Sequence, residues 1–356
     1  MAENNLVIML LWLGELTISS WVLSYGAEHL SIRYGAKFIG RTLLSVATTL
    51  PEIAIVIYAA ADGFYGIAIG SGLGSNLLMM TLGLAIMILI ATTRLSKAPL
   101  KGISVSMFKL DKIFLLTTAI VSALLFIDGY DYLDGFIFSG MFIAYLIMAL
   151  LEMRTEKRKE APRVLSHIES PEDRPKIIEI EEADASTKTS DNRLLKAALA
   201  FLAGTIGILV GAGPFIQSLE GFSSEIGVSS IILAVVISPI AGEMPEKISM
   251  MILARKGAHG ASIAIANVLG SKILNNTLLL AVAVFGAMFH AGFFAKIELT
   301  PILTFQVILV TVVTIIALIP MFIKKEIGLK VGTLLLGMYI ISLFIQFLLP
   351  HDPSEH

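Results

Sequence analysis

Long runs of apolar residues alternate with short polar connections along almost the whole chain of 356 residues. About twenty apolar residues in a helix are enough to cross a hydrocarbon core roughly 30 Å thick. The pattern predicts about ten such helices: 6–30, 37–60, 65–92, 113–129, 135–151, 194–218, 228–253, 260–289, 300–323 and 330–349. We therefore expect an all-α membrane protein that lies in the lipid bilayer.

One long polar segment interrupts this pattern. Residues 152–193 are rich in Glu, Lys and Arg and show no sustained apolar period, which is typical of a flexible charged linker. The segment divides the chain into a first five-helix repeat at 1–151 and a second five-helix repeat at 194–350.

Basic residues collect in alternate connections, and this bias sets the orientation of a membrane protein. Besides the linker, the basic connections contain Arg33, Lys37 and Arg41; Arg94, Lys97, Lys101, Lys109 and Lys112; Arg255 and Lys256; and Lys324, Lys325 and Lys330. The connections between them are acidic or nearly neutral. We therefore expect an integral protein of the cell membrane with both termini outside and 152–193 in the cytosol.

Composition agrees with this assignment. Hydrophobic residues make up 56% of the chain and charged residues 15%, whereas soluble domains carry about 25% charged residues. The absence of cysteine excludes disulfides, thiolate metal sites and cysteine nucleophiles. Neither HExxH nor a plausible Ser–His pairing occurs in the spans, so we expect a transporter rather than an enzyme. We also expect no resident cofactor, no nucleic acid and no obligatory protein partner.

A short motif pair occurs once in each half. Residues 47–53 read ATTLPEI and residues 241–247 read AGEMPEK; about twenty residues further on, 70–76 read GSGLGSN and 266–272 read ANVLGSK. Five predicted spans separate the copies, and an odd number reverses the direction in which each copy enters the membrane. The fold class is therefore about ten transmembrane helices arranged as two inverted five-helix repeats, an arrangement typical of transporters with a site near the midplane.

The motifs bring oxygen ligands and helix-breaking residues to the same depth. Pro51 and Pro245 each remove a backbone donor, so we expect interrupted helices there, and Glu52 and Glu246 bring one carboxylate from each half. The neutral oxygen ligands around them are Thr48, Thr49, Ser71, Ser75, Asn76, Asn267 and Ser271. Such oxygens suit a hard cation such as Ca²⁺, and the lack of nearby histidine or cysteine makes zinc or copper less suitable.

Each copy alone has a simpler explanation. A lone glutamate can be a paired packing defect, and glycines such as Gly70, Gly72 and Gly74 often form helix contacts. Two intramembrane carboxylates at matched offsets are hard to obtain from packing and indicate function.

At these residues the sequence resembles the sodium/calcium exchangers of the calcium:cation antiporter superfamily, whose repeats carry GTSLPE followed by GN-x-x-GSN. The copies retain Thr48, Leu50, Pro51, Glu52, Gly70, Gly74, Ser75 and Asn76, and then Pro245, Glu246, Asn267, Gly270 and Ser271. The resemblance covers nearly the whole chain. It implies alternating access with Ca²⁺ bound between Glu52 and Glu246. It also implies flanking positions for monovalent cations, formed by Thr48, Thr49, Ser75 and Ser271.

The second motif copy departs from the family pattern. Ala241 and Gly242 replace its Gly-Thr, Glu243 replaces its Ser and Lys272 replaces its Asn; in the first copy Ser71 replaces Asn. The second half thus loses hydroxyl and amide ligands and gains one charge of each sign. Coupling ion and stoichiometry therefore do not follow from the resemblance.

Two lysines are candidate partners for Glu243. Lys247 lies four residues further along the helix, where a local ion pair can form, and Lys272 is placed at the binding centre by the repeat. We predict the pair with Lys272, because an unpaired lysine there would repel the cation and would be costly to bury. Glu52, Glu243 and Glu246 against Lys272 would leave a formal charge of −2. In the alternative, Lys272 faces away and Glu243 pairs with Lys247.

The predicted function is secondary antiport of Ca²⁺ against Na⁺. The alternative is a proton-coupled antiporter of divalent or monovalent cations with the same fold, because Glu243 and Lys272 add titratable groups. A cation channel is less favoured, since channels are more often rings of symmetric subunits.

Overall fold

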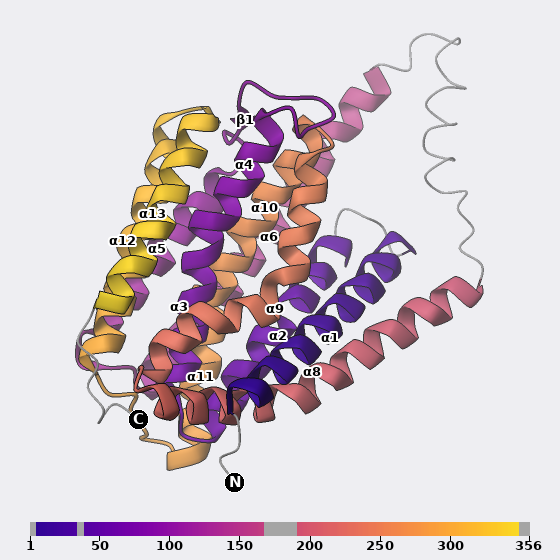
Figure 1. Ribbon diagram of the computed structural model, residues 1–356. Helices are drawn as coiled ribbons and strands as arrows, with labels where there is room; N and C mark the ends of the chain where they lie inside the picture. The colour runs from indigo at the N-terminus through magenta and orange to yellow at the C-terminus, as the bar shows by residue number, and fades with distance from the viewer. Residues whose placement is uncertain (1–4, 34–38, 167–190, 349–356) are drawn as a thin grey trace.

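A computed structural model describes residues 5–33, 39–166 and 191–348, without the side chains of some helical residues, Thr48 and Pro245 among them. Nearly all of this chain is helical (Figure 1). The first half contains α1 (Asn5–Arg33), α2 (Ile39–Ala61), α3 (Tyr65–Leu78), η1 (Met79–Gly83), α4 (Leu84–Thr92), α5 (Lys109–Leu125), η2 (Phe126–Asp128) and α6 (Tyr132–Ser166). The second contains α8 (Asp191–Ile226), α9 (Ser230–Ala254), α10 (Ala258–Leu274), η3 (Asn275–Leu279), α11 (Leu280–Ala291), α12 (Pro301–Ile323) and α13 (Leu329–Leu348).

Each half contributes five spans. Within the described residues, eight helical stretches are long and apolar enough to cross a membrane, and α3–η1–α4 and α10–η3–α11 each form one of them. The remaining two spans are α2 and α9, whose apolar stretches within the described side chains are Thr49–Ala61 and Ser230–Met244. The all-α membrane fold of about ten helices is confirmed, and α2 and α9 carry the Pro-Glu motifs.

The helices extend into the predicted linker from both ends. Helix α6 continues to Ser166 and α8 begins at Asp191, so residues 152–166 and 191–193 are helical where a flexible linker is predicted. Glu, Lys and Arg are good helix formers, which allows an apolar helix to continue beyond its last apolar residue. Residues 167–190 lie outside the described residues, and the domain boundaries at 152 and 193 stay a prediction.

The expected interruptions at the Pro-Glu motifs are wrong. Helix α2 runs through Pro51 and α9 runs through the position of Pro245 without a break. Proline fixes φ near the helical value and removes one backbone hydrogen bond; the hydrogen bonds on either side of it keep each helix continuous.

The irregular backbone instead lies in the neighbouring helices, as π-helical turns. These turns, η1 and η3, begin at residues 79 and 275, the same offset as between the Gly-Ser pairs of the motifs. In each turn a buried threonine, Thr81 or Thr277, donates to a carbonyl four residues earlier. Because π turns often occur at functional sites, their matched positions support the inverted repeat.

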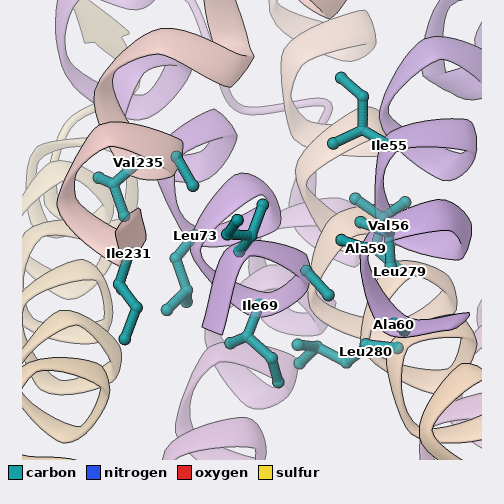
Figure 2. Packing of buried hydrophobic residues seen from close by; sticks show 14 of the residues in the cluster. Ile55, Val56, Ala59, Ala60, Ile69, Leu73, Ile231, Val235, Leu279 and Leu280 are labelled. Atoms are coloured by element: carbon teal, nitrogen blue, oxygen red, sulfur yellow. The ribbon is translucent and has the colours of Figure 1, made fainter. Parts of the chain in front are cut away.

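A glycine face of α3 packs directly on the backbone of α9. A Cβ atom at Gly74 would overlap the carbonyl oxygen of Val235, and one at Gly70 would lie 3.1 Å from the carbonyl oxygen of Ile231. Figure 2 shows Ile231 and Val235 of α9 beside Ile69 and Leu73 of α3 in the buried core. The contact interpretation of Gly70 and Gly74 is therefore confirmed, because only glycine permits this approach.

The matching position in the second half is packed differently. Gly270 corresponds to Gly74, but the nearest atom to a Cβ added there is the Tyr145 hydroxyl at 3.6 Å. Among the described contacts, the close approach at Gly74 thus has no equivalent at Gly270.

Helices α1 and α8 form a separate long pair, inclined to the rest of the bundle in Figure 1. Small residues allow the two backbones to approach: a Cβ at Gly26 would lie 2.7 Å from the carbonyl oxygen of Ala197, and one at Gly204 would lie 2.5 Å from the amide nitrogen of Leu23. This is the packing expected between helices in lipid.

Connections predicted on one side of the membrane contact each other. Strands β1 (Ile103–Ser104) and β2 (Glu326–Ile327) pair antiparallel between two basic connections. At the other end, Tyr130 and Ile297 exchange two backbone hydrogen bonds between two weakly charged connections. The alternation of charge in the sequence therefore corresponds to two ends of the bundle.

The contact at Gly74 predicts different effects of alanine substitution at Gly74 and Gly270. Gly74→Ala should lower the thermal stability of the purified protein and impair transport, because the methyl group would force α3 away from α9. Gly270→Ala, at the matched position, should keep both properties close to wild type. Equal tolerance of the two substitutions in a detergent melting experiment would contradict the packing described for Gly74.

Candidate cation site

The predicted site residues lie on four helices. Helix α2 carries Thr48, Thr49 and Glu52; α3 carries Ser71, Ser75 and Asn76; α9 carries Glu243 and Glu246; and α10 carries Asn267, Ser271 and Lys272. Their described side chains are buried or nearly so, with Glu52 and Glu246 only 2% exposed and Glu243 and Lys272 fully buried. Buried charges in a membrane protein need partners, so the contacts of these groups determine what the site can bind.

Glu243 and Lys272 form an ion pair in the interior. The ammonium contacts Glu243 Oε1, and it also donates to Ser75 Oγ at 2.6 Å. With the Asn275 amide oriented so that its oxygen faces the cluster, this oxygen accepts from Lys272 Nζ at 3.1 Å and from Ser75 Oγ at 2.6 Å. Oxygens from α9, α3 and η3 thus satisfy all three donors of the ammonium.

Lys247 reaches the same carboxylate from the other side. Its Nζ lies 3.6 Å from Glu243 Oε2 and donates to the carbonyl oxygen of Pro239 at 3.0 Å. The two partners that the sequence offered as alternatives are therefore both present. With Lys247 counted, three carboxylates face two ammonium groups and the formal charge is −1, which corrects the expected −2.

Glu52 and Glu246 have fewer charged neighbours. Glu246 Oε1 accepts from Asn267 Nδ2 at 2.8 Å. Glu52 lies against the backbone of α9, where a Cβ added at Gly242 would be 3.1 Å from its carboxyl carbon, and its buried Oε2 has no hydrogen-bond partner among the described residues. The small residue that replaces a family threonine thus leaves room for the carboxylate of the other half.

Several hydroxyl groups are buried on the same four helices. Ser71 and Ser238 have no hydrogen-bond partner among the described residues, Ser271 donates to the carbonyl oxygen of Val268 at 3.1 Å, and Thr49 is buried. The side chain of Thr48 lies outside the described residues. Across the described part of the chain, no three Asp, Glu or His side chains converge as metal ligands. A cation here would therefore depend on two carboxylates and neutral oxygens.

Sequence reasoning missed a buried amide network beside the site. Asn76 donates to the side-chain oxygen of Asn276, and Asn276 donates to Thr118 Oγ1 at 3.4 Å. Asn76 therefore contacts the second half rather than a carboxylate. Two adjacent asparagines, Asn275 and Asn276, inside the apolar run ILNNTLLL were the available signal.

Comparison with known proteins gives the same family as the motifs. The family model described as sodium/calcium exchanger protein matches residues 5–151 and 196–348. The chain belongs to this family. As a member, it is a membrane cation antiporter of the calcium:cation antiporter superfamily.

Relatives of low identity match nearly the whole chain. An uncharacterized membrane protein of Methanocaldococcus jannaschii is 25% identical over 339 residues, which cover 94% of each chain. The crystal structure of the H⁺/Ca²⁺ exchanger CAX superposes with a TM-score of 0.76 at 19% identity, over 96% of this exchanger and 82% of that chain. A structure of the sodium-calcium exchanger NCX_Mj superposes with a TM-score of 0.59 at 21% identity, over 97% of this chain and 99% of that chain. At these identities the structural likeness shows the fold.

The ion pairs of Glu243 predict how its substitution changes the stability of the protein. Glu243→Gln should destabilise the purified exchanger by about 3–5 kcal/mol, because it leaves two buried ammonium groups without their carboxylate. Adding Lys272→Gln should recover part of this loss, since one uncompensated charge is removed with its partner. Additive losses of the two single substitutions in thermal unfolding would show that the pair carries no coupling energy.

Proposed function

We propose that this exchanger moves Ca²⁺ in one direction and Na⁺ in the other, with Glu52 and Glu246 as the carboxylate ligands of the transported ions. The observation that carries the proposal is the pair of buried carboxylates, Glu52 and Glu246, one from each half, with Glu52 Oε2 lacking a hydrogen-bond partner among the described residues. Ser71 and Ser238 offer further unpartnered oxygens, and oxygen-only coordination suits Ca²⁺ and Na⁺.

Proton coupling is the second candidate. Two buried lysines accompany Glu243 in the site, so one anion is already compensated without a bound metal ion. Relatives with this fold include both an H⁺/Ca²⁺ exchanger and a sodium-calcium exchanger, so the fold accommodates either coupling ion.

Alternating access is the mechanism that we infer for the exchange. The site lies between two inverted halves, and their described contacts differ: Gly74 lies against the backbone of α9, whereas the described contact of Gly270 is the Tyr145 hydroxyl. Two halves that exchange these packing arrangements would expose the site to each side in turn. A carrier of this kind needs no ring of subunits, which disfavours the channel.

We further propose that the protein lies in the cell membrane with both termini outside and 152–193 in the cytosol. The positive residues of alternate connections support this orientation. The two groups of touching connections, Ile103 with Ile327 and Tyr130 with Ile297, support the same division.

Transport by the purified protein in liposomes can identify the coupling ion. Uptake of ⁴⁵Ca²⁺ should follow an outward Na⁺ gradient at constant pH and should show counterflow, as expected for a carrier. Uptake driven only by a pH gradient would replace the Na⁺ proposal by the proton alternative. Absence of Ca²⁺ flux under both gradients would overturn Ca²⁺ as the transported ion.

Glu52 should be indispensable. Glu52→Gln removes one of two cargo carboxylates, so Ca²⁺ binding should weaken by about 2–5 kcal/mol, the cost of truncating a buried charge partner, and exchange should be lost. Asp62→Asn, at the exposed end of the same helix, is the matched control and should transport normally. Near-normal ⁴⁵Ca²⁺ exchange by folded Glu52→Gln would exclude this residue from the site.

Orientation can be tested with single cysteines because the chain has none of its own. A cysteine at Asp128, whose side chain is 77% exposed, should react with a membrane-impermeant thiol reagent in intact cells. Cysteines at the exposed positions Lys256 and Lys325 should react only after permeabilisation. Labelling of all three from outside would contradict the proposed topology.

A further inference from the structure

We propose that Lys272 is a tethered cation that permanently fills one monovalent-ion position, so that the exchanger moves one divalent ion against two monovalent ions without net charge. The proposal rests on the proposed function and deepens it. It concerns how much charge each transport cycle carries.

The surroundings of the ammonium are those of a bound cation. Lys272 is fully buried, and its Nζ is held by a carboxylate oxygen of Glu243, the hydroxyl oxygen of Ser75 and the amide oxygen of Asn275. Three oxygens from three separate elements surround one positive charge. Because the charge is part of the chain, it cannot leave on either side of the membrane.

Both oxygens of the Glu243 carboxylate lie beside ammonium groups. One of its oxygens contacts Lys272 and the other lies 3.6 Å from Lys247. A carboxylate between two ammonium groups has little attraction left for a third cation. Glu243 is therefore a partner of the lysines, although its position in the motif suggests an ion ligand.

The remaining charges determine the cargo. Glu243, Lys247 and Lys272 together carry a fixed charge of +1, and Glu52 and Glu246 together carry −2. One divalent ion or two monovalent ions compensate the two cargo carboxylates equally. The two loaded forms then carry the same charge through the membrane, whereas the empty form leaves two buried carboxylates without counter-ions, which is costly.

The same charge count gives the consequence of removing the lysine. Lys272→Gln frees the position between Ser75, Glu243 and Asn275 for a third monovalent ion. Exchange by this variant should then carry one net charge per cycle. Removing the Glu243 charge as well, in Glu243→Gln/Lys272→Gln, eliminates the reason to bind a third ion and should restore exchange without net charge.

The test measures the steady-state Ca²⁺ ratio across proteoliposomes at a fixed gradient of the coupling ion. The membrane potential is set with valinomycin and K⁺, after K⁺ alone has been shown to drive no uptake. For wild type the ratio should be unchanged by a potential of about 100 mV. One net charge per cycle would shift it by roughly 50-fold, which is the expected result for Lys272→Gln.

Two further variants serve as controls. Glu243→Gln/Lys272→Gln should again be insensitive to potential, and the exposed Lys296→Gln, which removes a lysine paired with Asp128 at 3.4 Å outside the site, should behave as wild type. The dependence of the rate on monovalent-ion concentration should steepen from an order of about two to about three only in Lys272→Gln.

The outcomes separate the two proposals. A potential-dependent ratio in wild type overturns the tethered-cation inference while leaving Ca²⁺ antiport intact, and this measurement needs no variant to fold. Insensitivity of both wild type and folded Lys272→Gln also overturns it. Lack of Ca²⁺ exchange by wild type overturns the proposed function and the inference together.

Discussion

The compensation of buried charge around Glu243 is the constraint on which the site depends. Five ionisable side chains from three helices meet in a space where an isolated charge is expensive, and Glu243 makes this tolerable by contacting Lys272 and Lys247 at once. Lys272 in turn donates to Ser75 Oγ and to the amide oxygen of Asn275. Glu52 and Glu246 are left as the carboxylates that face no lysine within ion-pair distance among the described contacts.

The inverted repeat provides the scaffold for this cluster. The π turns η1 and η3 occur at equivalent positions and carry equivalent threonines, Thr81 and Thr277. The two halves nevertheless differ chemically where they meet. Asn76 of the first half corresponds to Lys272 of the second, and the first donates to an amide while the second carries a charge. A symmetric scaffold thus holds an asymmetric set of ligands.

The resemblance to exchangers predicts the backbone better than the ion chemistry. Membership and the ten-helix fold followed from motifs spaced at nearly constant offsets, because spacing along apolar helices fixes depth in the membrane. The predicted break at Pro51 was wrong because proline keeps a helical φ and the loss of one backbone hydrogen bond does not interrupt α2. Lys247 was recognised only as a local partner, since helical spacing shows which face it shares but not what the opposite helix presents.

The sequence by itself determined the membrane class, the number of spans, their inverted relation and the pair Glu52 and Glu246, because hydropathy and repeat offsets are properties of the chain alone. Only the tertiary structure decided which groups touch. The contacts of Glu243 with both lysines, of Asn275 with this cluster, of Asn276 with Asn76, and of Gly74 with the backbone of α9 depend on the rotation and distance between helices. These are set by packing over whole helices, and no short motif encodes them.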